Sequence, residues 1–429
     1  MPVKIKQVVF LLYYESIRAN LYLNLSMMYL AEDFNVTFVV QDLRNYFKVR
    51  SFFSKSGRSV TIKLFRISDY SPKVNELRCI ERSIDFISGN YNEVESELLY
   101  TNYKYFLEKN LKSGSIVYAG NGLHLQDFAL KDSTINIYSV FNDLANIDQR
   151  VFLDPEGANC NSSFYKKELN LPPLSSEQEI RLERWKSNYK QSKLKAHTVP
   201  QVALNFYKPT LLERAKNALY TGFEYFFNIG SINVIKHRNV FNFLTYKLFN
   251  TKKHIKKTNL DDVVLKPIPS NKDYIFVPLQ VTNDTQILLN SKYDNMGAIN
   301  YFRKQAQESG RVLVLKLHPA EPSDEFKQSI YQLQNSDDDI YLSKGNTFEL
   351  INNASKVGVN NSTAGFEAML LGIETEFIGK TYYSKLHSNE SLYYYLFTYL
   401  LKINFFTGEV YDDQVLTAIH KNIGYSSDD

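Results

Sequence analysis

Cysteine is scarce in this sequence. The 429 residues include only Cys79 and Cys160, and neither lies in a Cys-x-x-Cys or Cys/His cluster. Two isolated cysteines support neither a disulfide framework nor a zinc site. This usage is typical of a protein of the reducing cytoplasm, which is where we expect this one.

Long apolar runs are also missing. The run at residues 8–14 is followed by no small-residue cleavage site. It is also far shorter than the roughly 18 apolar residues of a membrane span. We interpret it as a buried strand and expect any membrane contact to be peripheral.

Charge of one sign is not in large excess. Fifty Lys and Arg against 46 Asp and Glu leave a formal net charge of +4, too little to indicate a protein that coats nucleic acid. Apolar residues make up 44% and charged residues 22% of the chain, which excludes wholesale disorder. The length predicts two or three domains.

Short apolar runs alternate with helical stretches, which predicts an α/β fold with parallel sheets covered by helices. A first domain is expected at 1–174 and ends at Pro172 and Pro173. Its expected strands are 8–14, 36–40, 59–65, 115–119 and 136–141, and its expected helices are 16–31 and 76–111.

The same alternation returns at 268–395, which predicts a second parallel-sheet domain. A helical tail is expected at 396–429. The expected strands of the second domain are 274–281, 311–317, 340–343, 357–360 and 374–378, and its expected helices are 294–310, 323–335, 347–354 and 363–371.

The region between them, 175–267, predicts helices rich in aromatic and basic residues. Within it, 236–257 contains seven Lys and Arg and no acidic residue. One interpretation is a solvated basic face. The other is that Phe241, Phe243 and their aromatic neighbours rest on an anionic membrane surface beside those cations.

Parallel sheets bind ligands beyond the carboxyl ends of their strands, so polar residues after the strands of the second domain are candidates. Asn361, Ser362 and Thr363 stand where a helix begins, and free N–H groups there favour an anion. An ordinary helix cap is the alternative. The other candidates for this crevice are Gln280, Lys316, His318, Pro319 and Glu367.

In the first domain, the polar segment 142–163 is dense in turn formers and is a candidate functional loop. Asp154 follows a short apolar run, so its carboxylate should emerge at a strand end. Asn159 and Ser163 could fold around it. The alternative is an ordinary Asp-Pro turn.

Four segments together resemble the capsule-polysaccharide synthesis family that contains retaining β-Kdo transferases. They are FLDPEGANCNSS at 152–163, FVPLQVTND at 276–284, KLHP at 316–319 and NNSTAGFEAMLLG at 360–372. The resemblance covers 136–163 and 274–379. It implies a GT-B-like architecture, with the acceptor on the first domain and a CMP-activated sugar on the second.

The resemblance also implies roles for single residues. Lys316 and His318 would bind the CMP phosphate, Ser362 and Thr363 the phosphate or ribose, Gln280 the donor and Glu367 the ribose. Asp154 would be the nucleophile of a double displacement, because retention of configuration requires two inversions.

A general base must deprotonate the acceptor, and the candidates are His124, Glu156, Glu76 and Glu81. The scheme requires no metal and no cofactor. The one Asp-rich run, 337–339, precedes an expected strand and is interpreted as a solvated loop.

The expected function is therefore a retaining transfer of β-Kdo from CMP-Kdo to a polysaccharide or glycolipid. Three alternatives stay open: transfer of a pseudaminic or legionaminic acid from its CMP donor, a nucleotide-sugar epimerase, and a non-catalytic capsule-assembly partner. The expected location is the cytoplasm, with contact at the inner face of the cytoplasmic membrane.

Overall fold

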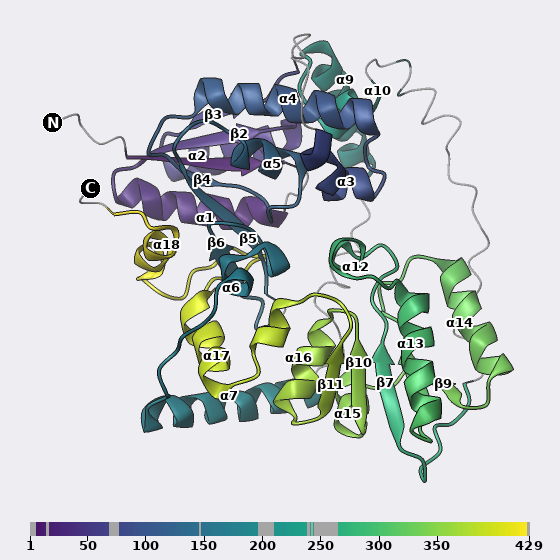
Figure 1. Ribbon diagram of the computed structural model, residues 1–429. Coiled ribbons are helices and arrows are strands. Elements are labelled where there is room, and N and C mark those ends of the chain that lie inside the picture. The colour runs from purple at the N-terminus through teal and green to yellow at the C-terminus, as the bar shows by residue number, and fades with distance from the viewer. Residues whose placement is uncertain are drawn as a thin grey trace. The chain divides into compact units, whose positions relative to one another are not determined.

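A computed structural model describes residues 6–13, 17–67, 77–145, 147–195, 210–237, 241, 243 and 265–426 (Figure 1). The chain divides into two compact units. Unit 1 comprises Met1–Glu168, Pro209–Thr251 and Leu396–Asp429, and unit 2 comprises Leu169–Lys208 and Lys252–Tyr395.

Unit 1 is built on a sheet with the strand order β12-β6-β5-β4-β1-β2-β3. Strands β1 to β5 pair in parallel, whereas β6 pairs antiparallel with β5 and β12. The strands are β1 (Gln7–Leu12), β2 (Asn35–Val40), β3 (Thr61–Leu64), β4 (Ile116–Tyr118), β5 (Tyr138–Leu144), β6 (Val151–Asp154) and β12 (Leu400–Leu401).

Helices cover both faces of this sheet, because successive side chains of a strand point to opposite faces. Phe10 packs with α1 (Ile17–Ala31), α2 (Leu43–Ser56) and α18 (Val415–Ile423). Leu11 packs on the other face with α4 (Glu93–Asn110), α5 (Leu125–Lys131) and α10 (Ile232–His237), and Figure 1 shows α1 and α4 on opposite sides of the sheet. Shorter helices are η2 (Asn159–Asn161) and α6 (Ser163–Lys166).

The prediction of one helix over 76–111 was wrong. The chain forms η1 (Leu77–Arg82), α3 (Ile84–Ile87) and α4 instead. Gly89 has a positive φ of 68° and ends α3. Asn92 and Glu95 then form a capping box that starts α4.

Unit 2 has a fully parallel sheet with the order β11-β10-β7-β8-β9. Helices α13 (Asn295–Glu308) and α14 (Asp324–Ser336) pack on one face, and α15 (Thr347–Asn352) and α16 (Thr363–Leu370) on the other. The strands are β7 (Tyr274–Pro278), β8 (Val312–Lys316), β9 (Ile340–Leu342), β10 (Lys356–Val359) and β11 (Glu374–Phe377). The remaining helices are α12 (Thr285–Asn290), η4 (Tyr382–Lys385) and α17 (Asn389–Tyr394).

The predicted middle region is helical where it is described, but its helices divide between the units. Helix α7 (Ser176–Lys195) belongs to unit 2, and α9 (Leu211–Phe226) and α10 belong to unit 1. The tail of unit 1 holds η5 (Tyr395–Tyr399), β12 and α18, so it contributes a strand as well as helices.

The predicted α/β class with two parallel-sheet units is confirmed. Among the described residues, no helix has both the length and the apolar character of a bilayer span. Apart from Lys236, His237, Phe241 and Phe243, the basic segment 236–257 lies outside the described residues.

Candidate functional site

In unit 2, the chain order along the sheet reverses between β7 and β10, which are neighbours. Such a switch point is where parallel sheets bind ligands. Gln280 follows β7 and Asn361 follows β10, and the two side chains meet there: Gln280 Nε2 donates to Asn361 Oδ1 over 3.0 Å. The structure therefore brings these two candidates together.

Both amides are buried and hold the loops around them. Asn361 Nδ2 donates to the carbonyl oxygen of Gln286 at 2.8 Å, and Asn295 Nδ2 donates to the carbonyl oxygen of Gln280 at 2.7 Å. Gln280 and Asn361 thus form the rigid floor of the edge, which positions the residues that follow them.

Helix α16 begins at this edge. Ser362 is its N-cap, and Ser362 Oγ accepts from the N–H of Ala364 at 3.3 Å. Thr363 Oγ1 lies 2.9 Å from the Tyr383 hydroxyl. A Cβ on Gly365 would lie 2.5 Å from the Phe377 ring, so this glycine lets α16 pack closely on the sheet.

Lys316 ends the neighbouring strand β8. Its Nζ donates to the carbonyl oxygen of Gly345 at 2.6 Å and to Thr347 Oγ1 at 2.7 Å. Burial lowers the pKa of this ammonium. An ammonium has three donors, so one remains for a ligand after these two bonds.

His318 follows Lys316. His318 Nδ1 accepts from the N–H of Ala320 at 3.1 Å, so in the neutral ring the proton sits on Nε2. Burial, together with the charge of Lys316, lowers the pKa of His318, against the opposing effect of Asp284 and Glu321. The imidazole is therefore a neutral Nε2–H donor at pH 7, and the exposed Pro319 follows it.

Glu367 is buried against α7. Its Oε1 accepts from the Tyr189 hydroxyl at 3.0 Å and from Lys193 Nζ at 2.6 Å. These contacts attach α7 to α16, and a ribose contact would have to use the other carboxylate oxygen.

In unit 1, Asp154 ends β6 as predicted, and it is fully buried. It accepts from the N–H groups of Glu156, Gly157 and Ser163 at 2.8–3.1 Å. Ser163 Oγ and the Tyr399 hydroxyl also donate to it, at 2.7 and 2.9 Å. The carboxylate thus organises its loop, and both of its oxygens are engaged.

The other candidates of this loop lie around it. Glu156 is half-buried and pairs with Lys166 Nζ at 2.8 Å. Asn159 has a positive φ of 51°, and its carbonyl oxygen accepts from Ser162 Oγ at 2.6 Å. Asn159 therefore shapes the turn, whereas Ser163 touches the carboxylate directly.

His124 precedes α5 on a second loop. His124 Nδ1 lies 3.2 Å from Asp85 Oδ1, and the N–H of Leu125 donates to Asp85 Oδ2 at 2.9 Å. Burial alone would lower the pKa of His124. The charge and hydrogen bond of Asp85, helped by Asp127, outweigh burial and raise it.

Asp127 holds this second loop in shape. It is fully buried and accepts from the N–H groups of Gly120, Gly122 and His124 at 2.9–3.1 Å, and also from the Tyr13 hydroxyl. A Cβ on Gly120 would lie 2.5 Å from the Tyr13 oxygen, so only glycine fits there.

The two loops of unit 1 touch each other. The N–H of Ala158 donates to the carbonyl oxygen of Asn121 at 2.9 Å. The structure therefore joins the Asp154 loop to the His124 loop. Sequence reasoning missed Asp85 and Asp127. Asp127 is the third residue of α5, where its carboxylate accepts the N–H of His124.

The Asp-rich run has another role. Asp337, Asp338 and Asp339 pair with Arg303, Lys266 and Lys272 at 2.5–3.2 Å. The three carboxylates therefore belong to surface ion pairs, in agreement with the interpretation of this run as a solvated loop.

The fold and these loops place the protein in the α/β class with two parallel-sheet units, the architecture that the GT-B-like expectation requires. Residues 190–386 match the family model described as capsule polysaccharide biosynthesis protein. The segments 276–284, 316–319 and 360–372 lie inside this match and 152–163 lies outside it. The predicted resemblance to the capsule polysaccharide synthesis family is confirmed over 190–386.

A curated relative is Protein FixF of Sinorhizobium fredii (strain NBRC 101917 / NGR234). It is 32% identical over 123 residues, which are 28% of this chain and 29% of FixF. The chain thus matches less than a third of the length of this relative.

Similar solved structures include two of Thermosulfurimonas dismutans KpsC. The β-Kdo 2,7 transferase is 16% identical with a TM-score of 0.37, covering 75% of this chain and 88% of that chain. The β-Kdo 2,4 transferase is 12% identical with a TM-score of 0.40, covering 72% and 87%. A UDP-GlcNAc 2-epimerase of Methanocaldococcus jannaschii is 11% identical with a TM-score of 0.31, covering 98% and 100%.

Proposed function

We propose that the protein is a glycosyltransferase that moves an acidic ketose, β-Kdo in the first instance, from a CMP-activated donor to a polysaccharide or glycolipid acceptor. The observation that carries this proposal is the carboxyl edge of unit 2, where Lys316, His318 and the start of α16 offer donors. This edge lies within the range that matches the family.

The nucleotide binds to unit 2 in this scheme. When CMP leaves, its phosphate gains negative charge, which donors stabilise best when they are already in place. The Nε2–H of His318, the third N–H of Lys316 and the positive end of α16 supply such donors without a metal ion.

The acceptor binds to unit 1, and transfer retains configuration through two displacements. An oxygen of Asp154 bonds to the anomeric carbon as the bond to CMP breaks. Before this oxygen can form that bond, it must give up a hydrogen bond from Ser163 or Tyr399. The acceptor hydroxyl then displaces the carboxylate while a base takes its proton.

His124 is the favoured base. Asp85 binds its Nδ1, so Nε2 is the acceptor nitrogen of the neutral ring. Of the other candidates, Glu156 is paired with Lys166, Glu81 is exposed, and Glu76 lies outside the described residues.

The protein also contacts an anionic membrane surface in this proposal. Helix α9 supports it, because Leu212, Leu219, Phe223 and Phe226 are 53–80% exposed and share one helical face. Exposed apolar side chains beside Lys216 suit the interface of an anionic bilayer.

Calorimetric binding of CMP, UMP and GMP tests the proposal. Wild-type protein should bind CMP selectively, and His318→Ala should lose most of that binding. His387→Ala, which alters an exposed histidine of the same unit, is the control. Selective UMP binding would favour the epimerase, and binding of none of the three would favour a non-catalytic partner.

A further inference from the structure

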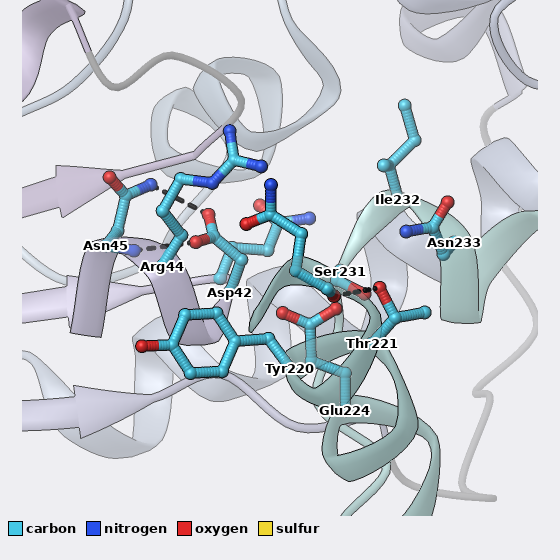
Figure 2. Close-up of a pocket in the computed structure, with 11 residues that line it drawn as sticks. Asp42, Arg44, Asn45, Tyr220, Thr221, Glu224, Ser231, Ile232 and Asn233 are labelled. Carbon is cyan, nitrogen blue, oxygen red and sulfur yellow. Dashed lines mark hydrogen bonds between the residues drawn. The ribbon is translucent and has the colours of Figure 1, made fainter. Parts of the chain in front are cut away.

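A cavity of about 300 Å³ lies in unit 1 beyond the carboxyl end of β2, and neither Asp154 nor His124 lines it. In Figure 2, Thr221 and Glu224 of α9 lie across from Asp42 and Asn45 at the start of α2. The other residues that line the cavity are Gln41, Arg44, Asn217, Tyr220, Ser231, Ile232 and Asn233. The volume is at the lower end of the range of small-molecule sites.

Helix α9 reverses the usual orientation of an amphipathic helix. Its apolar face is exposed, whereas Asn217, Tyr220, Thr221 and Glu224 face the cavity at helical spacing. Glu224 Oε1 accepts from the N–H of Leu43 at 2.9 Å, and Tyr220 stacks on Phe47 with ring centroids 5.1 Å apart. A polar face turned inward needs polar partners there.

Two amides of the wall lie behind its surface. Gln41 is 2% exposed, and its Oε1 accepts from Gln126 Nε2. Asn45 is equally buried, and its Nδ2 donates to Asp42 Oδ2 at 2.7 Å. The wall groups that a ligand can reach are those of Asn217, Tyr220 and Thr221, whose side chains are partly exposed.

The charges of the wall define the class of ligand. The carboxylates of Asp42 and Glu224 outnumber the guanidinium of Arg44, which disfavours a phosphate or an acidic sugar. Burial raises the pKa of both carboxyl groups. Amides, hydroxyls and one aromatic ring are instead suited to a neutral molecule with many hydroxyl groups.

We propose that this cavity binds one uncharged sugar ring of the acceptor saccharide. The identification of the ligand as acceptor rests on the proposed transferase function, whereas the binding of a neutral sugar rests on the cavity alone. Gln41 contacts Gln126 on α5, the helix that follows His124, so the cavity adjoins the element that carries the favoured base.

Saturation-transfer NMR of nucleotide-free protein tests the cavity. The probes are the methyl glycosides of glucose, galactose, mannose and N-acetylglucosamine, each titrated separately. At least one should bind, and Asn217→Leu should weaken it about three- to tenfold through the loss of one hydrogen-bonding side chain. Arg214→Leu, on the same helix but outside the cavity, should bind like wild type.

Glu224→Gln keeps an acceptor for the Leu43 N–H and removes the charge. A neutral ligand should bind this variant within about threefold of wild type. Preference for glucosamine over all four glycosides, with loss in Glu224→Gln, would instead identify a site for an ammonium group and overturn the proposal.

Failure of all four glycosides to bind would also overturn it, and so would equal binding by Asn217→Leu and wild type. If CMP still binds under those conditions, the transferase proposal stands without this cavity. Glycoside binding in a protein that binds no CMP would leave the cavity as a sugar site and remove the transferase.

Discussion

At the carboxyl edge of the sheet in unit 1, carboxylates hold the loops, whereas at the same edge of unit 2 amides and Lys316 share this role with one buried carboxylate, Glu321. Asp127 and Asp154 accept backbone N–H groups that follow β4 and β6. In unit 2, Gln280 and Asn361 bind each other, and Lys316 and His318 stand at the end of β8, the strand next to β7 in the sheet.

Under the proposed function, this difference explains how two sheets of similar architecture would bind different ligands, the acceptor on unit 1 and the nucleotide on unit 2. Donors that already bind a carboxylate are not offered to an anion, so the loops of unit 1 repel a phosphate. Under the proposed function, the N–H groups of Lys316 and His318 remain available to attract one. The predictions below test whether the two edges differ in function as they differ in charge.

The largest effect should come from Asp154, the proposed nucleophile of unit 1. Asp154→Asn should reduce transfer by about 10⁴-fold, because an amide cannot form the glycosyl ester. CMP binding should be unchanged, because the proposed CMP site lies on unit 2. Mass spectrometry of the wild type should show a sugar attached to Asp154 during turnover.

Tyr399→Phe is the matched control, since it removes one donor to the same carboxylate. It should keep most of the transfer rate. If Asp154→Asn transfers sugar like wild type but melts at a lower temperature, Asp154 only organises its loop.

The next largest effect should be on stability. Asp127→Ala leaves the buried N–H groups of Gly120, Gly122 and His124 without their acceptor. At about 1–3 kcal/mol for each unsatisfied group, reduced by relaxation, we expect unit 1 to lose about 3–5 kcal/mol. Hydrogen exchange of residues 116–127 and urea unfolding measure this.

Asn361→Ala makes the corresponding change in unit 2. It removes a neutral amide rather than a carboxylate, so about 1–2 kcal/mol is expected. An equal or larger loss from Asn361→Ala would contradict the view that carboxylates hold unit 1 more firmly.

A smaller effect concerns catalysis at unit 2. His318→Ala should reduce transfer about 100-fold, because it removes one donor to the leaving phosphate. His318→Gln, whose Nε2 is also a neutral donor, should restore part of the rate. Steady-state kinetics with a CMP-sugar measure these rates. A rate for His318→Ala equal to that of His387→Ala would contradict the role of His318 as a donor to the leaving phosphate.

The smallest expected effect concerns two histidines, His124 and His318, whose pKa values are shifted in opposite directions from the ordinary value. The pKa of His124 lies above, and that of His318 below, the usual value of about 6.5. The raised pKa of His124 stabilises the fold at low pH, and this contribution is lost as pH rises through the folded pKa. The lowered pKa of His318 has the opposite effect on the stability of the fold. Its contribution to stability is present at high pH and is lost as pH falls through the folded pKa.

NMR titration of the histidine rings measures both groups. Asp85→Asn should lower the pKa of His124 and leave that of His318 unchanged, since Asp85 contacts only the former in unit 1. Equal pKa values in the wild type would remove this distinction between the two edges.

The elements of unit 2 were predictable because local signals agree with the fold. The expected strand 357–360 and helix 363–371 correspond to β10 (Lys356–Val359) and α16 (Thr363–Leu370). A β-branched run followed by a Ser N-cap needs no distant partner to be recognised. Lys316, His318 and Asn361 could be placed at one edge for the same reason.

Other parts of the site depend on contacts that no local pattern contains. Asp85 lies 39 residues before His124, and Tyr189 lies 178 residues before Glu367. The sequence marked His124 and Glu367 as candidates, but only folding showed that one is paired with a carboxylate and the other attaches a helix.

By itself, the sequence determined the α/β class, the strand ends that carry the polar residues and the family pattern over 274–379, which lies inside the matched range. Periodicity and caps are local properties, so these follow from short segments. The tertiary structure alone decided which donors are already used, which carboxylates are buried, and that α9 turns its polar face inward. Those facts depend on what packs against each side chain, and packing joins residues that lie far apart in the chain.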